Sequence, residues 1–198
     1  AISEQETIVV PLSLFRERPL TEGQPINLEE YDNWLMVRQY RHALDRAVAC
    51  LAARAHSKHE IEQKLLRVGY RPCTVEMVLY KLEREHLLND ADFARQWVEA
   101  RSGRKLGRSR IAQELRRKGI DADEAEEALS AIGEDAQLAD AIALAEKAAA
   151  RAKSDENPRK TYQRIAAMLA RRGFRWDIAK EALAQVLQAC LLYTSDAA

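Results

Sequence analysis

The stretch that decides the fold reads Ile111-Ala-Gln-Glu-Leu115-Arg-Arg-Lys-Gly119-Ile120. Ile111 and Leu115 are four residues apart, so their side chains lie on the same face of a helix. Gly119 then ends that helix, because glycine enters the left-handed backbone conformation without the strain that a Cβ atom causes. The apolar Ile120 can fold back onto the last turn. The stretch therefore predicts a short amphipathic helix with a defined end.

The same spacing occurs twice more along the chain. Isoleucine, leucine four residues later and glycine four residues after that are found at Ile61, Leu65 and Gly69, and at Ile165, Leu169 and Gly173. Six, nine and ten residues after each glycine come apolar residues that share one face of a following helix: Val75, Val78 and Leu79; Ala125, Ala128 and Leu129; Ala179, Ala182 and Leu183. A repeat of about 50 residues is typical of stacked helical units.

Signals for helix starts agree with this repeat. Ser57 has the capping-box spacing to Glu60, Asp121 begins an analogous box, and Pro72 and Pro158 suit a first helical position. A leading helix is expected before the two helices of each repeat, over about 40–55, 91–103 and 135–151. We therefore predict an all-α fold of three tandem three-helix, helix-turn-helix-like repeats, with roughly nine helices. One such repeat buries little apolar surface alone, so we expect the repeats to stack into an elongated, curved rod.

The two ends depart from the repeat. We expect an N-terminal extension, three repeats and a tail, over residues 1–33, 34–89, 90–133, 134–190 and 191–198. The run Thr7-Ile8-Val9-Val10 is short and β-like, and it is followed by Pro11, Pro19, Gly23 and Pro25. The tail breaks the helical pattern, and we expect it to be foreign to the native chain.

Composition excludes several classes of protein. The chain has 198 residues, 47% of them apolar, with few glycines and prolines, which favours a helical core over a many-stranded one. No apolar stretch approaches the roughly 18 residues of a membrane span, and the chain does not start like a signal peptide, so we expect a cytoplasmic protein. Three dispersed cysteines and four histidines form no metal-ligand set, and catalytic motifs are missing. We expect no metal, no cofactor and no enzymatic activity.

The charge is neutral in total but segregated along the chain. The 31 lysines and arginines balance 31 acids, which excludes a uniformly basic nucleic-acid binder. Residues 101–118 hold eight bases and one acid, residues 119–146 nine acids and no base, and residues 151–175 eight bases and two acids. The first 40 residues hold seven acids and three bases. The two basic blocks are therefore the places to look for a partner.

Arginine suits contact with phosphate or with carboxylates of a protein groove, so we expect the basic blocks to form the partner- or DNA-binding surface. The residues expected to make these contacts are Arg101, Arg104, Lys105, Arg108, Arg110, Arg116, Arg117, Lys118, Arg159, Lys160, Arg171, Arg172 and Arg175. For any single arginine, a solvated helix face balanced by the neighbouring acidic helices is the alternative interpretation.

Two further readings concern nucleic acid. The short middle helix, glycine turn and following helix of each repeat resemble a helix-turn-helix, so a stand-alone DNA-binding regulator is the alternative function. The aromatic residues have core-like helical spacing, and we interpret them as packing residues rather than base-stacking ones: Tyr70, Phe93, Trp97, Phe174 and Trp176.

Four segments of the chain each have a distinctive pattern of residues. They are Leu44-Asp45-Arg46-Ala47-Val48 with Ala52-Ala53-Arg54-x-His56-Ser57-x-x-Glu60-Ile61-x-x-Lys64-Leu65; Leu87-Leu88-Asn89-Asp90-x-x-Phe93-Ala94; Lys105-Leu106-Gly107-Arg108-x-Arg110-Ile111-x-Gln113-Glu114-Leu115-x-x-Lys118-Gly119-Ile120; and Leu169-Ala170-Arg171-Arg172-Gly173-Phe174. In these segments the chain resembles the RecX family of bacterial regulatory proteins, over about residues 28–187. The lead-in Leu20-x-x-Gly23-x-x-Ile26-x-x-Glu29 resembles longer members of the family whose N-terminus carries a β-hairpin, and the resemblance implies a truncated hairpin in the extension here.

The resemblance implies a partner. RecX-like proteins bind the RecA recombinase filament on single-stranded DNA and restrain its growth, ATP hydrolysis, strand exchange and activation of SOS cleavage. It implies a modulator of DNA repair and recombination, not an enzyme, with no catalytic residues to transfer. Contact with single-stranded DNA is expected to be weak and sequence-independent, and the protein to be a monomer. The basic contact residues named above rest on charge clustering, not on the resemblance.

Overall fold

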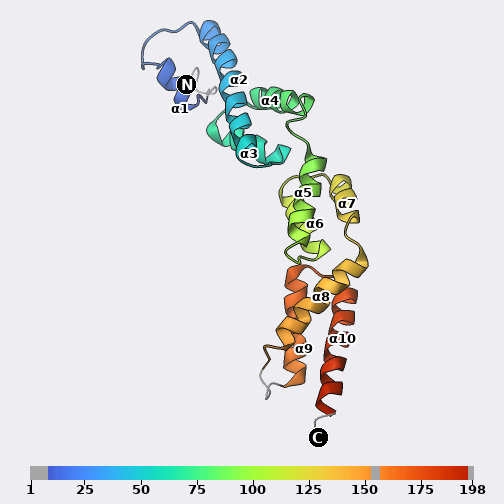
Figure 1. The fold of residues 1–198 in the computed structure, drawn as a ribbon. Coiled ribbons are helices and arrows are strands. Elements are labelled where there is room, and N and C mark those ends of the chain that lie inside the picture. The colour runs from blue at the N-terminus through green and yellow to red at the C-terminus, as the bar shows by residue number, and fades with distance from the viewer. Residues whose placement is uncertain (1–8, 153–156, 196–198) are drawn as a thin grey trace. The chain divides into compact units, whose positions relative to one another are not determined.

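The protein is all-helical wherever the structure describes it. The computed structural model describes the backbone over residues 9–152 and 157–195, and these ranges contain ten α-helices and no strand. The chain folds as two compact units, residues 1–93 and 94–198 (Figure 1). The first unit holds α1 to α4: Leu12–Glu17, Leu28–Ala53, Lys58–Val68 and Pro72–Arg84. Helices α5 to α10 follow: Asp90–Ser102, Arg108–Arg117, Ala122–Ser130, Glu134–Ala149, Pro158–Arg172 and Trp176–Ser195. The predicted fold class is confirmed.

Helices α2, α3 and α4 enclose the core of the first unit. Ala43 of α2, Ile61 and Leu65 of α3 and Val78 of α4 belong to one buried cluster, each at most 1% exposed. The capping box at the start of α3 is confirmed, because the Ser57 hydroxyl accepts from the Glu60 N–H and the Glu60 carboxylate accepts in return. Local capping thus orients the helix whose Ile-Leu face the core needs.

The start of α4 is tied to α2 by polar contacts. The Arg71 N–H donates to the buried Gln39 Oε1 at 3.1 Å, and the Arg71 guanidinium pairs with Asp32. That hydrogen bond holds the pKa of the Asp32 carboxyl below its ordinary value. Pro72 occupies the first turn, as predicted, where its missing N–H costs no helical hydrogen bond.

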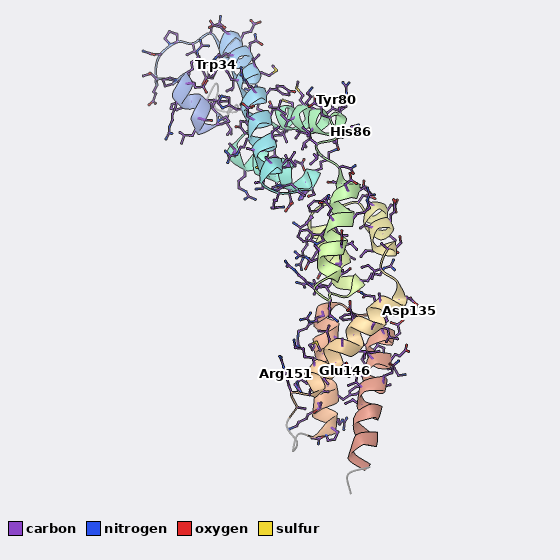
Figure 2. The ribbon with its side chains drawn as sticks, viewed as in Figure 1. Trp34, Tyr80, His86, Asp135, Glu146 and Arg151 are labelled. Carbon is purple, nitrogen blue, oxygen red and sulfur yellow. The ribbon has the colours of Figure 1, made fainter. Side chains whose placement is uncertain are left out.

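The N-terminal part differs from the prediction in two ways. Helix α1 adds a tenth helix: its Leu14 is fully buried against Tyr31 and Leu35 of α2. The Arg18 guanidinium, at the end of α1, lies over the ring of Trp34 of α2, which is labelled in Figure 2. Within the β-like run 7–10, residues 9 and 10 are not in a strand, and the first two lie outside the described residues. Helix α2 begins at Leu28, inside the predicted extension.

The three repeat glycines end their helices as predicted. Gly69, Gly119 and Gly173 have φ angles of 95°, 74° and 86°. The apolar residue after each glycine is 5% exposed, so it does fold back onto the core. After α6 and α9, its N–H also bonds five residues back, from Ile120 to the Leu115 carbonyl and from Phe174 to the Leu169 carbonyl.

In the second unit, helices α8, α9 and α10 pack side by side (Figure 1). Ala141 of α8, Ile165 and Leu169 of α9 and Leu183 of α10 are all fully buried in one cluster. Helix α6 packs against α7, and its Ile111 and Leu115 are fully buried. The isoleucine–leucine face therefore points inward in all three repeats.

Candidate partner and nucleic-acid interface

The basic residues divide into those that are paired within the chain and those that are not. The most connected group surrounds Glu114 of α6. Its Oε2 accepts from Arg101 Nε at 2.7 Å and from Trp97 Nε1 at 3.2 Å, and its Oε1 lies 3.4 Å from Arg110 Nε. The Arg101 guanidinium and the Lys118 ammonium lie 4.0 and 4.2 Å from the centroid of the Trp97 ring. These three cations are held mainly by their own repeat.

Acidic residues of α7 and α8 neutralise others. Lys105 Nζ lies 3.1 Å from Asp140 Oδ1, and Arg108 pairs with Glu126. Arg175 bridges Glu134 at 3.4 Å and Asp177 at 2.7 Å. Figure 2 shows another acid of this block, Asp135, in the first turn of α8. Lys105, Arg108 and Arg175 thus each have an acidic partner within the chain, as the alternative interpretation expects.

Arg172 has a structural contact. Its Nη1 donates to the carbonyls of Arg104 at 3.2 Å and Lys105 at 3.4 Å. Lys105 has a φ of 56°, in the left-handed region that non-glycine residues rarely adopt. Arg172 thus secures the tight loop between α5 and α6 from the end of α9.

Six of the thirteen predicted contact residues remain available. Their side chains are exposed and have no ion pair within the described part of the chain: Arg104, Arg116, Arg117, Arg159, Lys160 and Arg171. Arg116 and Arg117 lie at the end of α6, Arg159 and Lys160 at the start of α9, and Arg171 at its end. The available positive charge is thus on α6, on α9 and in the loop before α6.

Helices α6 and α9 meet end to end through backbone atoms. The Gly107 N–H donates to the Arg172 carbonyl at 2.8 Å, and the Ser109 N–H to the Gly173 carbonyl at 3.2 Å. A Cβ atom on Gly107 would lie 2.2 Å from the carbonyl carbon of Gly173, and one on Gly173 would lie 2.3 Å from the Arg110 Cβ. Glycine is needed at both positions for this approach, independently of the helix end at Gly173.

An open hollow of about 490 Å³ lies beside this junction. It is lined by Ser109, Arg110, Gln113, Arg116, Ala170, Arg171 and Gly173. The structure thus brings Arg110, Arg116 and Arg171 of the predicted set together. The sequence analysis did not identify the other lining residues. The one local signal for this junction was Gly107, which stands at the start of α6 where a capping side chain is usual.

Four of the five aromatic predictions hold in whole or in part. Tyr70, Phe93 and Phe174 are at most 5% exposed, and Trp97 is partly buried between its cations. The prediction for Trp176 is wrong, because its side chain is 61% exposed. It is the first residue of α10, and the buried face of that helix begins one turn later, at Ala179.

The described residues offer neither a metal-ligand cluster nor a membrane-spanning helix. No group of three or more histidine, cysteine or acidic side chains is arranged to hold a metal ion there. Among the described helices, none is both long and apolar enough to cross a membrane.

Comparison with known proteins identifies all three repeats. The models that match describe the first, second and third three-helix domains of RecX, over residues 43–82, 89–129 and 135–183. The regulatory protein RecX of Mycobacteroides abscessus is 38% identical over 141 residues, 68% of this chain and 68% of that protein. That of Prosthecochloris aestuarii is 36% identical over 148 residues, 74% of this chain and 95% of that protein.

A solved structure gives the same result. The crystal structure of RecX from Lactobacillus salivarius superposes with a TM-score of 0.70 at 26% identity, covering 76% of this chain and 97% of that one. Three family domains are thus matched in chain order, and one relative is matched along nearly its whole length. The chain belongs to the RecX family of regulatory proteins.

Proposed function

We propose that this protein binds the RecA recombinase filament on single-stranded DNA and inhibits its growth, ATPase, strand exchange and SOS co-protease activity. In this way it would regulate DNA repair and recombination in the cytoplasm, as a monomer. The observation that carries the proposal is the presence of all three RecX domains, in order, on one chain. The proposal assigns no catalytic step and no cofactor to the protein.

The charge distribution supports binding to a nucleoprotein filament. Of the thirteen predicted contact residues, six are exposed with no ion pair among the described residues, while the other seven contact groups of the chain itself. Unpaired arginines are free to contact DNA phosphate or protein carboxylates, and such contacts set the rate and register of association. Inhibition then requires only that bound protein obstructs the addition of recombinase subunits or their rearrangement.

The alternative, a stand-alone helix-turn-helix regulator, gains no support from the charges on the second helix of the motif in the second repeat. In the second repeat that helix is α7, the element that would enter the major groove. Its exposed residues include Asp123, Glu126 and Glu127, which would face DNA phosphate. We therefore do not adopt this function.

The test is a recombinase assay with the full chain. RecA from a related bacterium is assembled on circular single-stranded DNA, and ATP hydrolysis and strand exchange are followed as the protein is added. We expect both rates to fall at protein concentrations at or below that of RecA. Unchanged rates at a stoichiometric ratio would refute the proposal. Sequence-specific duplex binding at least ~10³ tighter than non-specific binding would instead favour the alternative.

A further inference from the structure

The hollow at the junction of α6 and α9 is built from small residues and rimmed by cations. Gly173, Ala170 and Ser109 leave the space, because none of them has a side chain longer than one heavy atom beyond Cβ. Two helices contribute the rim: Arg110, Gln113 and Arg116 come from α6, and Arg171 from α9. No apolar side chain larger than alanine lines the hollow. It therefore offers hydrogen-bond donors but no pocket for an apolar anchor.

The rim arginines are free to bind an anion. Arg116 and Arg171 are exposed and have no carboxylate partner within the described residues. Arg110 contacts Glu114 at 3.4 Å through Nε, which leaves its terminal nitrogens to other acceptors. The positive charge at the rim therefore exceeds the negative charge that the chain supplies there.

The same junction removes groups that would repel an anion. The last carbonyls of a helix carry its negative dipole end, and α9 ends at this hollow. Two of these oxygens, on Arg172 and Gly173, already accept hydrogen bonds from the Gly107 and Ser109 N–H groups of α6. The end of α9 is thus neutralised by the start of α6, and the rim arginines dominate the local field.

We propose that this hollow binds a phosphate group of a single-stranded DNA backbone; the inference rests on the proposed function, which brings the protein to such a strand. Planar guanidinium groups match phosphate oxygens in a bidentate geometry. Hot spots of protein–protein interfaces, in contrast, are desolvated pockets that hold an aromatic or aliphatic side chain of the partner. The lining of this hollow does not provide such a pocket. The open shape lets a strand pass across the hollow, and contact limited to phosphate is independent of sequence.

The contact between Gly107 and Gly173 gives this site its geometry. It joins the helix that bears Arg110 and Arg116 to the one that bears Arg171 through backbone atoms, which flex less than side chains. The spacing of the rim cations is therefore a property of the second and third repeats together. Neither repeat alone would form the site.

The test compares two double variants of the full chain with equal charge change. Arg116→Glu with Arg171→Glu reverses the rim, whereas Lys147→Glu with Lys180→Glu reverses two exposed bases of α8 and α10 that lie outside the predicted contact set and have no ion pair among the described residues. The probe is a fluorescently labelled 30-nucleotide oligo(dT), titrated by anisotropy at several salt concentrations. We expect the rim variant to bind at least ~10-fold more weakly at low salt, with a shallower salt dependence, and the control to lose less than ~3-fold.

Equal losses in the two variants would overturn the site, because net charge alone would then explain binding. Arg171→Lys should bind between wild type and the rim variant, since it keeps the charge but loses the fork. Circular dichroism melting checks that both variants fold. If the wild type binds oligo(dT) through the rim yet leaves RecA activity unchanged, the hollow stands and the proposed function fails. If the rim variant loses oligo(dT) binding but still inhibits RecA fully, the function stands and the filament contact lies elsewhere.

Discussion

The middle helices α3 and α6 have the same core and different beginnings. Each buries an isoleucine and a leucine four residues apart, all of them at most 1% exposed, and each is followed by a left-handed glycine. Helix α3 is capped by its own Ser57 and Glu60. Helix α6 begins after Gly107, which has no capping side chain, and the Arg172 and Gly173 carbonyls at the end of α9 accept from the Gly107 and Ser109 N–H groups. The apolar repeat is therefore the same while the source of the cap changes.

At the start of each of these two helices, a backbone N–H donates to a side chain of the helix that begins the next repeat. The Lys58 N–H of α3 donates to Asp90 Oδ1 at 2.8 Å, and the Arg108 N–H of α6 donates to Gln137 Oε1 at 2.9 Å. A charged acceptor serves α3 and a neutral one serves α6. The two repeats therefore share their apolar core but differ in the polar contacts at the start of the middle helix.

Replacing Gly107 by serine should have the largest effect. Serine is ordinarily as good a helix cap as glycine or better, but here its Cβ would meet the Gly173 backbone at 2.2 Å. Overpacking costs ~1–3 kcal/mol, and each lost backbone hydrogen bond adds about 1 kcal/mol. We expect Gly107→Ser to lower the free energy of unfolding by about 2–4 kcal/mol in urea titrations. It should also weaken oligo(dT) binding, because the rim arginines lose their spacing.

Two matched variants control this prediction. Gly133 caps α8 with nearly the same backbone angles, φ −66° and ψ 151° against −72° and 151°, but nothing lies within 4 Å of its added Cβ. Gly133→Ser should therefore be neutral or stabilising by a few tenths of a kcal/mol. Ser57→Gly, at the start of α3, should cost less than about 1 kcal/mol. If all three serine–glycine exchanges change stability equally, α6 is not capped by α9.

What could be predicted from the sequence is what depends on near neighbours in the chain. The isoleucine–leucine face, the glycine ends and the Ser57 cap are settled within a few residues, and all are found in the structure. The partners of single cations are not settled locally. Lys105 pairs with Asp140 and Gly107 meets Gly173, at separations of 35 and 66 residues, and only the packed repeats bring such groups together.

Two other differences between the sequence prediction and the structure also arise from contacts that the local sequence does not determine. Helix α1 has six residues, too short for propensity to indicate it, and it is stable because Leu14 is buried against α2. Trp176 has the spacing of the buried face of α10 but lies ahead of the turn where that face begins. In both cases burial depends on packing against other helices, which periodicity does not report.

The second effect in size concerns Glu114, which has no acidic counterpart in α3, where Lys64 occupies the same place after Ile61. Glu114→Gln keeps the shape but removes the charge that Arg101, Arg110 and Trp97 share. Hydrogen bonds to charged groups contribute about 1.5–3 kcal/mol, so we expect a loss of about 1–2 kcal/mol in the free energy of unfolding. Because Arg110 is released toward the hollow, oligo(dT) binding should become about two- to threefold tighter.

The control for this variant is Glu62→Gln in α3. Its carboxylate lies 3.5 Å from His59 Nδ1, and both side chains are more than a third exposed, so its removal should leave the urea midpoint unchanged. Weaker oligo(dT) binding by Glu114→Gln, or a stability equal to that of wild type, would show that Glu114 does not organise the cations of α6.

The smallest expected change in stability comes from replacing Asp90 by asparagine, which gives the start of α3 an amide acceptor like that of α6. Burial raises the pKa of the Asp90 carboxyl, helped by nearby Glu83 and Glu60 and opposed by its bond to the Lys58 N–H. The folded state thus holds this proton more tightly than the unfolded state does. The contribution of Asp90 to stability is therefore full below its unfolded pKa of about 3.9 and is lost as pH rises through the raised value.

Asp90→Asn should remove this pH dependence, because an amide oxygen still accepts from the Lys58 N–H, as that of Gln137 accepts from Arg108. We expect the variant to be more stable than wild type by about 0.5 kcal/mol at pH 7, since a buried charge is no longer desolvated. The gain should shrink as pH falls, because the raised pKa means that folded wild-type Asp90 takes up its proton at a higher pH than the unfolded chain does. Urea unfolding of both proteins between pH 4 and pH 7 measures the difference. A constant difference across that range, or a loss at pH 7, would mean that the charge of Asp90 is needed at this junction.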